Sequence, residues 1–172
     1  MLVSLIAAVA ESGVIRVGLS GDQPPFNMKD ENGELMGIDI DIVNAMAMAI
    51  GAKPEFVEMP FKDLIPALEA REVDIVMSGM TMTPARNLKV AFVGPYMVSG
   101  KSILTTNAVL ARVEEAEDID QSQVKMAALK GSTSEEFVKT VWPRMQLTTT
   151  DDYDAAVDLV REGKVGALVA DF

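Results

Sequence analysis

Hydrophobic and polar residues follow two alternating spacings along most of this chain. Short apolar or alternating runs predict strands at residues 14–19, 55–58, 75–77, 125–129, 146–149 and 165–170. Between these runs, apolar residues recur at every third or fourth position, which is the spacing of a helix with one buried face. Strands and helices in this order predict an α/β fold of mostly parallel sheets with flanking helices. The run at 75–77 is predicted to be buried on both faces.

Glycines and capping residues set the limits of the predicted helices. The helix entered at Gly37 is closed by Gly51, and its predicted inward face consists of Ile38, Ile42, Ala45 and Ala49. A helix at 151–162 is predicted to turn inward Ala155, Leu159 and Val160. The first ten residues are apolar but too short to span a bilayer. They read either as a short helix over 4–12 or, from Ala8-Val9-Ala10, as the end of a signal peptide without a basic start; we favour the helix.

The strand–helix alternation runs in two blocks that are joined by an extended segment. The first block ends near residue 97 and the second begins near residue 102. We therefore expect a first lobe at 1–97, a hinge crossing at 98–101 and a second lobe at 102–172. The acidic run at 114–120 is predicted to be a solvated loop or helix face.

Composition narrows the chemistry that the chain can perform. Of its 172 residues, 49% are hydrophobic and 24% are charged, which is typical of a globular protein. The net charge of −11 excludes nucleic acid and anionic membrane surfaces as expected partners. Histidine and cysteine are both absent, which removes the usual zinc sites and the Ser-His-Asp triad. We expect no metal, no cofactor and no catalytic residue.

Residues 74–86 carry the first candidate site. Ser78, Gly79 and Thr81 follow the carboxyl end of the predicted strand, and Thr83-Pro84 is typical of a helix start. Arg86 then falls in the first helical turn. Backbone N–H groups at a helix start together with a guanidinium favour a carboxylate ligand. The alternative is an ordinary turn whose arginine is solvated or paired with a nearby acid.

A second strand end repeats this pattern in the other block. The predicted strand at 125–129 leads into Gly131-Ser132-Thr133, and a helix is predicted at 134–141. Hydroxyl groups at this helix start suit an anion. The stretch lacks the GxxxxGK pattern of a nucleotide-binding loop. The alternative is a plain strand-to-helix turn with capping hydroxyl groups.

Five segments together resemble one protein family. They are VIRVGLS…PPFNMKDENGELMGIDIDI, FKDLIPALEAREVDIVMSGMTMTPAR, VAFVGPY, ALKGSTSE and GKVGALVAD. In this order they resemble the periplasmic solute-binding proteins of the polar amino-acid class, which are the amino-acid-binding subunits of bacterial ABC importers. The resemblance implies a two-lobed periplasmic-binding-protein type II fold that closes around one free amino acid.

The resemblance also implies roles for individual residues. Arg86 would hold the α-carboxylate of the ligand, Asp171 would pair with its α-ammonium, and Phe61 would stack on its aliphatic part. The remaining groups would hydrogen-bond the ligand or line its site. The full set of implied ligand-binding residues is Gln23, Phe26, Phe61, Ser78, Gly79, Thr81, Arg86, Gly131, Ser132, Thr133 and Asp171.

Three positions depart from the pattern of the family. Gln23 stands where many members place a stacking tyrosine, and Ser20 stands where binders of basic amino acids have an acid. Lys130 lies beside the second turn, where it is either solvated or favours an acidic ligand. Gln23 leaves the second wall of the aromatic sandwich around the ligand unassigned, and Ser20 weakens the prediction of a lysine or arginine ligand, so the identity of the amino acid stays open.

The implied function is binding and delivery to the membrane permease of an ABC importer, in the periplasm or tethered at the outer face of the cytoplasmic membrane. A sensor ectodomain and a dehydratase-like enzyme on the same scaffold are the alternatives. Family members continue past the position of Asp171, so we expect an incomplete second lobe with an unprotected sheet edge. Such an edge predicts a possible dimer or swapped assembly.

Overall fold

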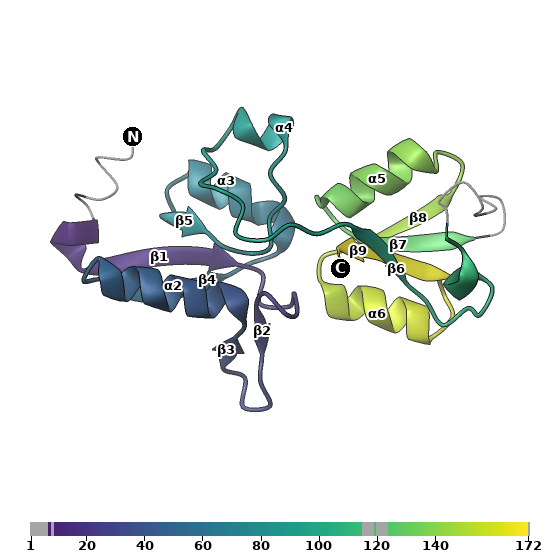
Figure 1. Cartoon of the computed structure of the whole chain (residues 1–172), viewed down its shortest axis with the longest axis horizontal. Coiled ribbons are helices and arrows are strands. Elements are labelled where there is room, and N and C mark those ends of the chain that lie inside the picture. The colour runs from purple at the N-terminus through teal and green to yellow at the C-terminus, as the bar shows by residue number, and fades with distance from the viewer. Residues whose placement is uncertain (1–6, 8, 115–118, 120–123, 172) are drawn as a thin grey trace. The chain divides into compact units, whose positions relative to one another are not determined.

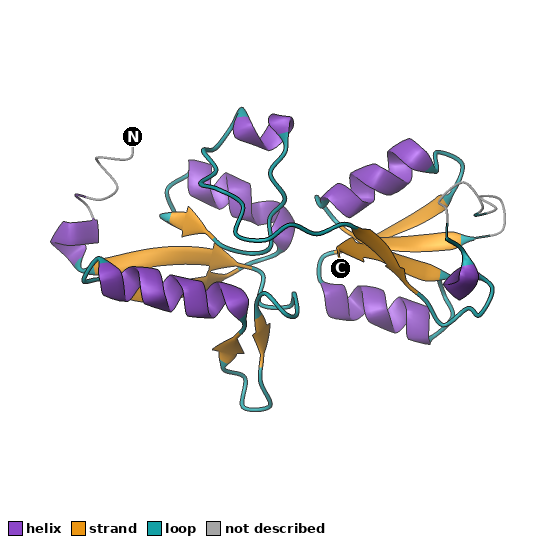
Figure 2. Ribbon diagram, in the orientation of Figure 1, coloured by secondary structure: helices purple, strands orange, loops and turns teal. Residues whose placement is uncertain are grey.

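The structure is a computed structural model that describes residues 7, 9–114, 119 and 124–171. The chain divides into two compact units, Met1–Gly94 and Pro95–Phe172. Each unit contains a central sheet with helices packed against it (Figures 1 and 2). The predicted hinge at 98–101 stays a prediction, and most of the acidic run at 114–120 lies outside the described residues.

The first unit is built on a three-stranded parallel sheet. Its strands are β1 (Val14–Leu19), β4 (Lys53–Glu58) and β5 (Ile75–Val76), in the order β4-β1-β5. Helix α2 (Ile38–Ala49) covers the face of β1 that carries Val17, whereas α3 (Leu64–Glu69) contacts the other face at Gly18. The smaller elements are η1 (Phe61–Asp63), α4 (Pro84–Asn87) and the hairpin of β2 (Met28–Lys29) and β3 (Leu35–Met36).

The second unit is built on a four-stranded sheet of order β6-β9-β7-β8. Strands β7 (Lys125–Leu129), β8 (Gln146–Thr150) and β9 (Ala167–Asp171) are parallel, and β6 (Lys101–Leu104) runs antiparallel to β9. Helices α5 (Thr133–Val141) and α6 (Tyr153–Arg161) cover opposite faces of this sheet, and η2 (Leu110–Arg112) follows β6 (Figure 1).

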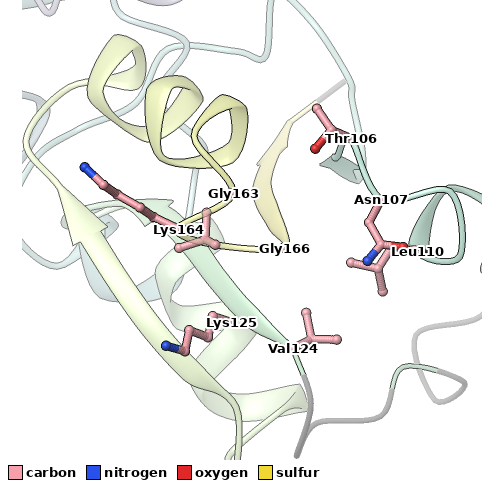
Figure 3. Close-up of a pocket in the computed structure, with 9 residues that line it drawn as sticks. Thr106, Asn107, Leu110, Val124, Lys125, Gly163, Lys164 and Gly166 are labelled. Carbon is pink, nitrogen blue, oxygen red and sulfur yellow. Dashed lines mark hydrogen bonds between the residues drawn. The ribbon is translucent and has the colours of Figure 1, made fainter.

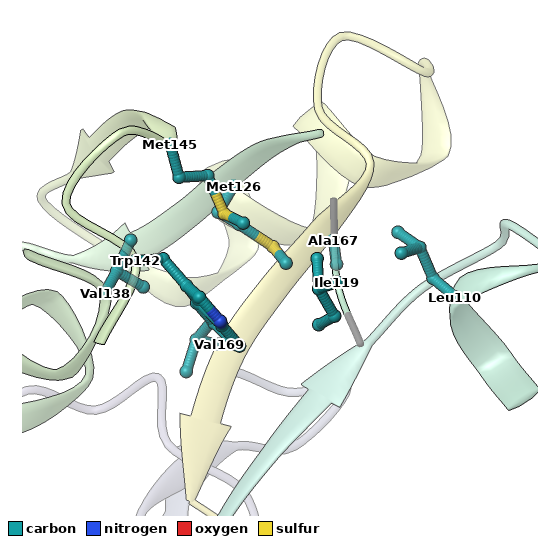
Figure 4. Packing of buried hydrophobic residues seen from close by; sticks show 8 residues of the cluster. All are labelled: Leu110, Ile119, Met126, Val138, Trp142, Met145, Ala167 and Val169. Carbon is teal, nitrogen blue, oxygen red and sulfur yellow. The ribbon is translucent and has the colours of Figure 1, made fainter. Parts of the chain in front are cut away.

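Each face of the second sheet has its own buried cluster. On the α5 face, Trp142 packs over Met126 and Val169, and it meets the ring of Phe137 edge-on at a centroid distance of 5.2 Å (Figure 4). On the α6 face, Ala127 and Leu168 pack against the buried residues of that helix. Consecutive residues of β7 and β9 thus alternate between two cores, as strands covered on both faces must. This arrangement confirms the predicted α/β class.

The strand prediction at 75–77 is wrong in one respect. Ile75 and Val76 form β5, but both are half-buried, and β5 is an edge strand that pairs with β1 over two residues only. An apolar run identifies a strand but not its place in the sheet, because burial on the second face depends on distant chain segments.

The predicted inward face of α2 is wrong, and that of α6 is right only in part. In α2, Ala45 and Ala49 are exposed and Ile38 and Ile42 are half-buried, whereas the buried residues are Asp39, Ile40, Val43 and Ala47. In α6, Val160 is buried as predicted and Leu159 is half-buried against the same core, but Ala155 is exposed and the buried alanine is Ala156. Helix α2 is apolar on most sides, so two stripes fit the spacing, and a buried Asp39 argues against the correct one. The amide Nδ2 of Asn27 donates to Asp39 Oδ2 at 2.7 Å, which satisfies that buried carboxylate.

The predicted N-terminal helix is seen only in part. Residues 7 and 9–12 are helical, and Gly13 ends the helix with a φ of 68°. The Gly13 N–H donates to the Val9 carbonyl at 2.8 Å, which is a typical helix C-terminus. Residues 1–6 and 8 lie outside the described part of the chain.

Candidate functional site

In the first unit, polar groups gather at the carboxyl ends of β1 and β5. Ser78 follows β5 and is buried, and its Oγ accepts a hydrogen bond from the Ser20 N–H at 3.1 Å. The hydroxyl groups of Ser78 and Ser20 lie 3.2 Å apart. Gln23 Oε1 lies 3.5 Å from the same Ser78 hydroxyl. The structure therefore brings Ser78 and Gln23 together beside the neighbouring carboxyl ends of β1 and β5.

Gly79 makes room for this cluster. Its φ of +55° lies in the left-handed region that favours glycine. A Cβ placed on Gly79 would lie 3.2 Å from Gln23 Oε1 and 3.3 Å from Phe26 Cδ2. Both side chains thus pack directly against the backbone at position 79, and four of the predicted site residues form one cluster.

Asn27 is a residue of this cluster that sequence reasoning missed. It is fully buried, and its Oδ1 accepts hydrogen bonds from the Gly21 N–H at 2.7 Å and from the Ser20 hydroxyl at 3.3 Å. Its amide group donates to the buried Asp39. Asn27 therefore holds the loop that carries Gln23 and Phe26 against α2. The only signal in the sequence is an asparagine directly after a proline-rich loop, which is common in ordinary turns.

Arg86 lies at the start of α4, where three contacts fix its position. Its backbone N–H donates to Thr83 Oγ1 at 3.2 Å, so Thr83 is the predicted N-cap. Its Nη1 donates to the Thr81 carbonyl at 2.8 Å. Its guanidinium carbon lies 5.5 Å from the centroid of the Phe61 ring, within cation–π range. Phe61 is buried at the start of η1, and the Arg86 guanidinium lies over its ring.

This arrangement pre-orders a planar cation. A guanidinium that lies over an aromatic ring and donates to a carbonyl loses little further freedom when it binds a carboxylate. Thr81 contributes its carbonyl to this arrangement. The structure thus brings Phe61, Thr81 and Arg86 together in a second cluster of the first unit.

In the second unit, the predicted turn after β7 forms the start of α5. Ser132 is the N-cap: its hydroxyl donates to the Leu129 carbonyl at 2.6 Å and accepts from the Glu135 N–H at 3.2 Å. The Gly131 N–H donates to Glu135 Oε2 at 2.7 Å. The carboxylate of Glu135 therefore lies at this helix start, as in a capping box.

The charge of Glu135 is supported by its surroundings. Burial raises the pKa of this carboxyl, but hydrogen bonds from the Lys139 ammonium and the Gly131 N–H outweigh that effect. The exposed Lys130 adds a further attractive charge. As a result the pKa of Glu135 lies below its ordinary value, and the carboxylate stays ionised near neutral pH.

Thr133 and Asp171 meet through a lysine that sequence reasoning did not single out. Lys101 Nζ lies 2.7 Å from Thr133 Oγ1, 3.0 Å from Ser134 Oγ and 2.6 Å from Asp171 Oδ1. The antiparallel register of β6 and β9 places Lys101 directly opposite Asp171. Pairing between residues this far apart in the sequence leaves no local signal.

A separate cavity of about 470 Å³ lies at the other end of the second sheet. Its lining includes Asn107, Leu110, Lys125 and Gly166, which surround the amino ends of β7 and β9. The ammonium ends of Lys125 and Lys164 are turned away from Asn107 and Leu110 (Figure 3). None of the predicted site residues lines this cavity.

The described residues contain no group of three acidic side chains that could hold a metal ion. No helix within residues 7, 9–114, 119 and 124–171 is long and apolar enough to cross a membrane.

Known proteins resemble this chain over most of its length. The profile described as bacterial extracellular solute-binding proteins, family 3, matches residues 15–164. The cyclohexadienyl dehydratase of Pseudomonas aeruginosa is 29% identical over 98% of this chain and 63% of its own length. The ABC transporter arginine-binding protein 1 of Escherichia coli is 27% identical over 99% of this chain and 68% of its own length. The chain thus spans about two thirds of the length of these curated relatives.

A solved structure also resembles this chain. The crystal structure of an ancestral amino acid-binding protein, a precursor of cyclohexadienyl dehydratase, matches with a TM-score of 0.92 and 38% identity. The match covers 96% of this chain and 73% of that chain. Its fold agrees with the predicted periplasmic-binding-protein type II class.

Proposed function

Because this chain belongs to the bacterial extracellular solute-binding proteins of family 3, we propose that it binds one free amino acid and delivers it to the permease of an ABC importer. The arginine-binding relative is named as a component of an ABC transporter, which supports this class of partner. We place the protein in the periplasm, or tethered at the outer face of the cytoplasmic membrane.

The observation that carries this proposal is the pre-ordered guanidinium of Arg86. Free amino acids share an α-carboxylate, and a planar guanidinium binds a carboxylate through two parallel hydrogen bonds. The Phe61 ring at 5.5 Å and the Thr81 carbonyl at 2.8 Å restrict the movement of the guanidinium before the ligand arrives. Much of the ordering cost is then met by folding rather than by binding.

The α-ammonium of a free amino acid needs hydrogen-bond acceptors. Ser78 and Gly79 lie at the end of β5 beside the side-chain amide oxygen Oε1 of Gln23, and Asp171 ends β9. We assign the α-ammonium to Asp171, with Ser78 and Gly79 as further partners. Gln23 and Phe26 would contact the rest of the ligand.

The remaining predicted groups lie at the start of α5. Thr133 would offer its hydroxyl to the ligand, and Gly131 would contribute backbone. The Ser132 hydroxyl already donates to Leu129 and accepts from Glu135. Ser132 therefore acts on the ligand mainly by holding this helix start in place.

Dehydration is the second candidate function, because a relative of similar identity is named a cyclohexadienyl dehydratase. Removal of water needs a group that gives a proton to the leaving hydroxyl. The carboxylate of Asp171, at the end of β9, lies 2.6 Å from the Lys101 ammonium. We assign this carboxylate to the ligand α-ammonium and not to proton transfer. We therefore favour binding without turnover. A sensor ectodomain would use the same ligand contacts and differ only in its partner.

The experiment is a thermal-shift screen of the twenty amino acids, followed by calorimetry on each amino acid that raises the melting temperature. A ligand at 100 times its Kd adds about 2.7 kcal/mol, which corresponds to a rise of roughly 5 °C or more for a chain of this size. If no amino acid binds, the proposed function is wrong. To separate binding from dehydration, NMR spectra of the bound amino acid are followed with equimolar protein. They should stay unchanged over hours, and signals of a new product would favour the dehydratase function.

A further inference from the structure

Lys101 holds a position in which all of its hydrogen-bonding capacity is used. An ammonium group has three N–H donors and no acceptor. Its three oxygen neighbours are Thr133 Oγ1 at 2.7 Å, Ser134 Oγ at 3.0 Å and Asp171 Oδ1 at 2.6 Å. The side chain of Lys101 is 22% exposed and that of Asp171 is 32% exposed, so water reaches both only partly.

This arrangement changes the charge that a ligand meets. A lone Asp171 would present one negative charge to a ligand ammonium. With Lys101 at 2.6 Å, the two charges cancel, and the ammonium of a ligand becomes the second cation on a single carboxylate. A ligand with a cationic side chain would bring a third positive charge, and like charges at short range are unfavourable. A ligand with a second carboxylate would instead restore neutrality.

The hydroxyl groups of Thr133 and Ser134 hold the Lys101 ammonium where it can change the charge that a ligand meets. Thr133 and Ser134 begin α5, so the helix fixes their positions relative to β9. They keep the Lys101 ammonium beside Asp171 even when solvent competes for it. Two neutral hydroxyl acceptors can also be exchanged for a ligand carboxylate, which is the stronger partner of an ammonium.

We propose that Lys101 is a specificity-determining residue that makes this chain select acidic amino acids over basic ones. This inference rests on the proposed function, because it names the class of amino acid that the same site takes. It differs from what the name of the arginine-binding relative says of that protein. Lys101 acts through its charge and through its hold on Asp171.

The test is calorimetry with L-glutamate and L-arginine on the unaltered chain and on three variants. The unaltered chain should bind glutamate more tightly than arginine. Lys101→Met should lower the ratio of the arginine Kd to the glutamate Kd by about tenfold to a hundredfold, since a charge-assisted contact is lost. Lys101→Arg keeps the charge and should keep the preference for glutamate.

Lys125→Met is the matched control. Lys125 also begins a strand of the second sheet, and it is exposed at the end of β7 that lies away from Asp171. Its removal changes the net charge by the same amount and should leave the ratio within about twofold of that of the unaltered chain, since exposed distant charges are screened. Circular dichroism checks that each variant folds. If Lys101→Met is unfolded, the preference of the unaltered chain and of Lys101→Arg still decides.

The outcomes separate this inference from the proposed function. If the unaltered chain prefers arginine, or if it binds only uncharged amino acids, Lys101 does not set specificity, although the chain still binds amino acids. A ratio that stays the same in a folded Lys101→Met variant leads to the same conclusion. If no amino acid binds to the unaltered chain, both the inference and the proposed function are overturned.

Discussion

At the scale of single residues, two cations are held in place by oxygen atoms before any ligand is present. The guanidinium of Arg86 is tied to the Thr81 carbonyl and stacks on Phe61. The cap that starts its helix was predictable, because Thr83-Pro84 is a local signal. The partner of Lys101 was not predictable, because it depends on the register of two strands 70 residues apart.

Replacement of Arg86 by lysine tests the first cation. Arg86→Lys keeps one positive charge but loses the planar pair of donors and the stacking on Phe61. We expect a cost of about 2 kcal/mol in binding, or roughly thirtyfold in Kd. Calorimetry with the amino acid found in the screen measures it. Arg161→Lys, on the exposed end of α6, is the control and should bind as the unaltered chain does. Equal affinities for both variants would remove Arg86 from the site.

A second residue-scale prediction concerns Asp74, which stabilises the first unit. Asp74 accepts hydrogen bonds from the Arg16 backbone at 2.8 Å and from both ends of its guanidinium group at 3.1 and 2.8 Å. Hydrogen bonding by the Arg16 side chain is the main cause that holds the pKa of Asp74 below its ordinary value, against the effect of burial. Because its folded-state pKa is depressed, the stability that Asp74 adds is present above pH 4 and is lost as pH falls toward that lower pKa.

We expect Asp74→Asn to reduce the free energy of unfolding by about 1 kcal/mol at pH 6, allowing for the partial exposure of Arg16. The difference from the unaltered chain should shrink as pH falls below the ordinary aspartate pKa, since the unaltered carboxylate becomes protonated as pH approaches its lowered folded-state pKa. Urea unfolding at a series of pH values measures both. Asp158→Asn, at an exposed ion pair of α6, should change stability by less than about 0.5 kcal/mol. A difference for Asp74→Asn that grows at low pH would contradict this assignment.

At the scale of elements, local signals worked where the chain itself decides the outcome. The helix starts at Thr83 and Ser132 follow from capping chemistry, and the structure contains both. The buried face of α2 did not follow, because apolar residues lie on more than one side of that helix, and the face of α6 followed only at Leu159 and Val160. Which stripe packs inward depends on the sheet beneath, and that partner is set by tertiary structure.

A prediction at the scale of elements concerns Ser132, whose hydroxyl satisfies two backbone groups at the start of α5. Ser132→Ala removes the acceptor of the Glu135 N–H and the donor to the Leu129 carbonyl. We expect a loss of about 1 kcal/mol in the free energy of unfolding. Thr140→Ala, on the exposed side of the same helix, is the matched control and should be nearly neutral. Urea unfolding of both variants decides, and equal stabilities would mean that the cap contributes nothing.

At the scale of the whole molecule, the chain has two units with separate cores. Ile15 and Val43 belong to a buried cluster of the first unit. Met126 and Trp142 belong to a cluster of the second unit, and the third described cluster, on the α6 face, also lies there. The sequence predicted two blocks from the repeated strand–helix order. It could not show which residues form each core, because that depends on sheet order and on helix faces.

The separation of the cores predicts that a cavity in one unit weakens that unit first. Ile15→Ala and Met126→Ala each remove a buried side chain, and each should cost about 2 to 5 kcal/mol in the unit concerned. Hydrogen exchange followed by mass spectrometry measures the effect segment by segment, because local opening reports local stability. Ile15→Ala should speed exchange in β1, β4 and α2 and leave β7 and α5 nearly unchanged. Met126→Ala should do the reverse. If either variant speeds exchange equally in both units, the chain unfolds as one cooperative body, and the two cores do not act as independent sources of stability.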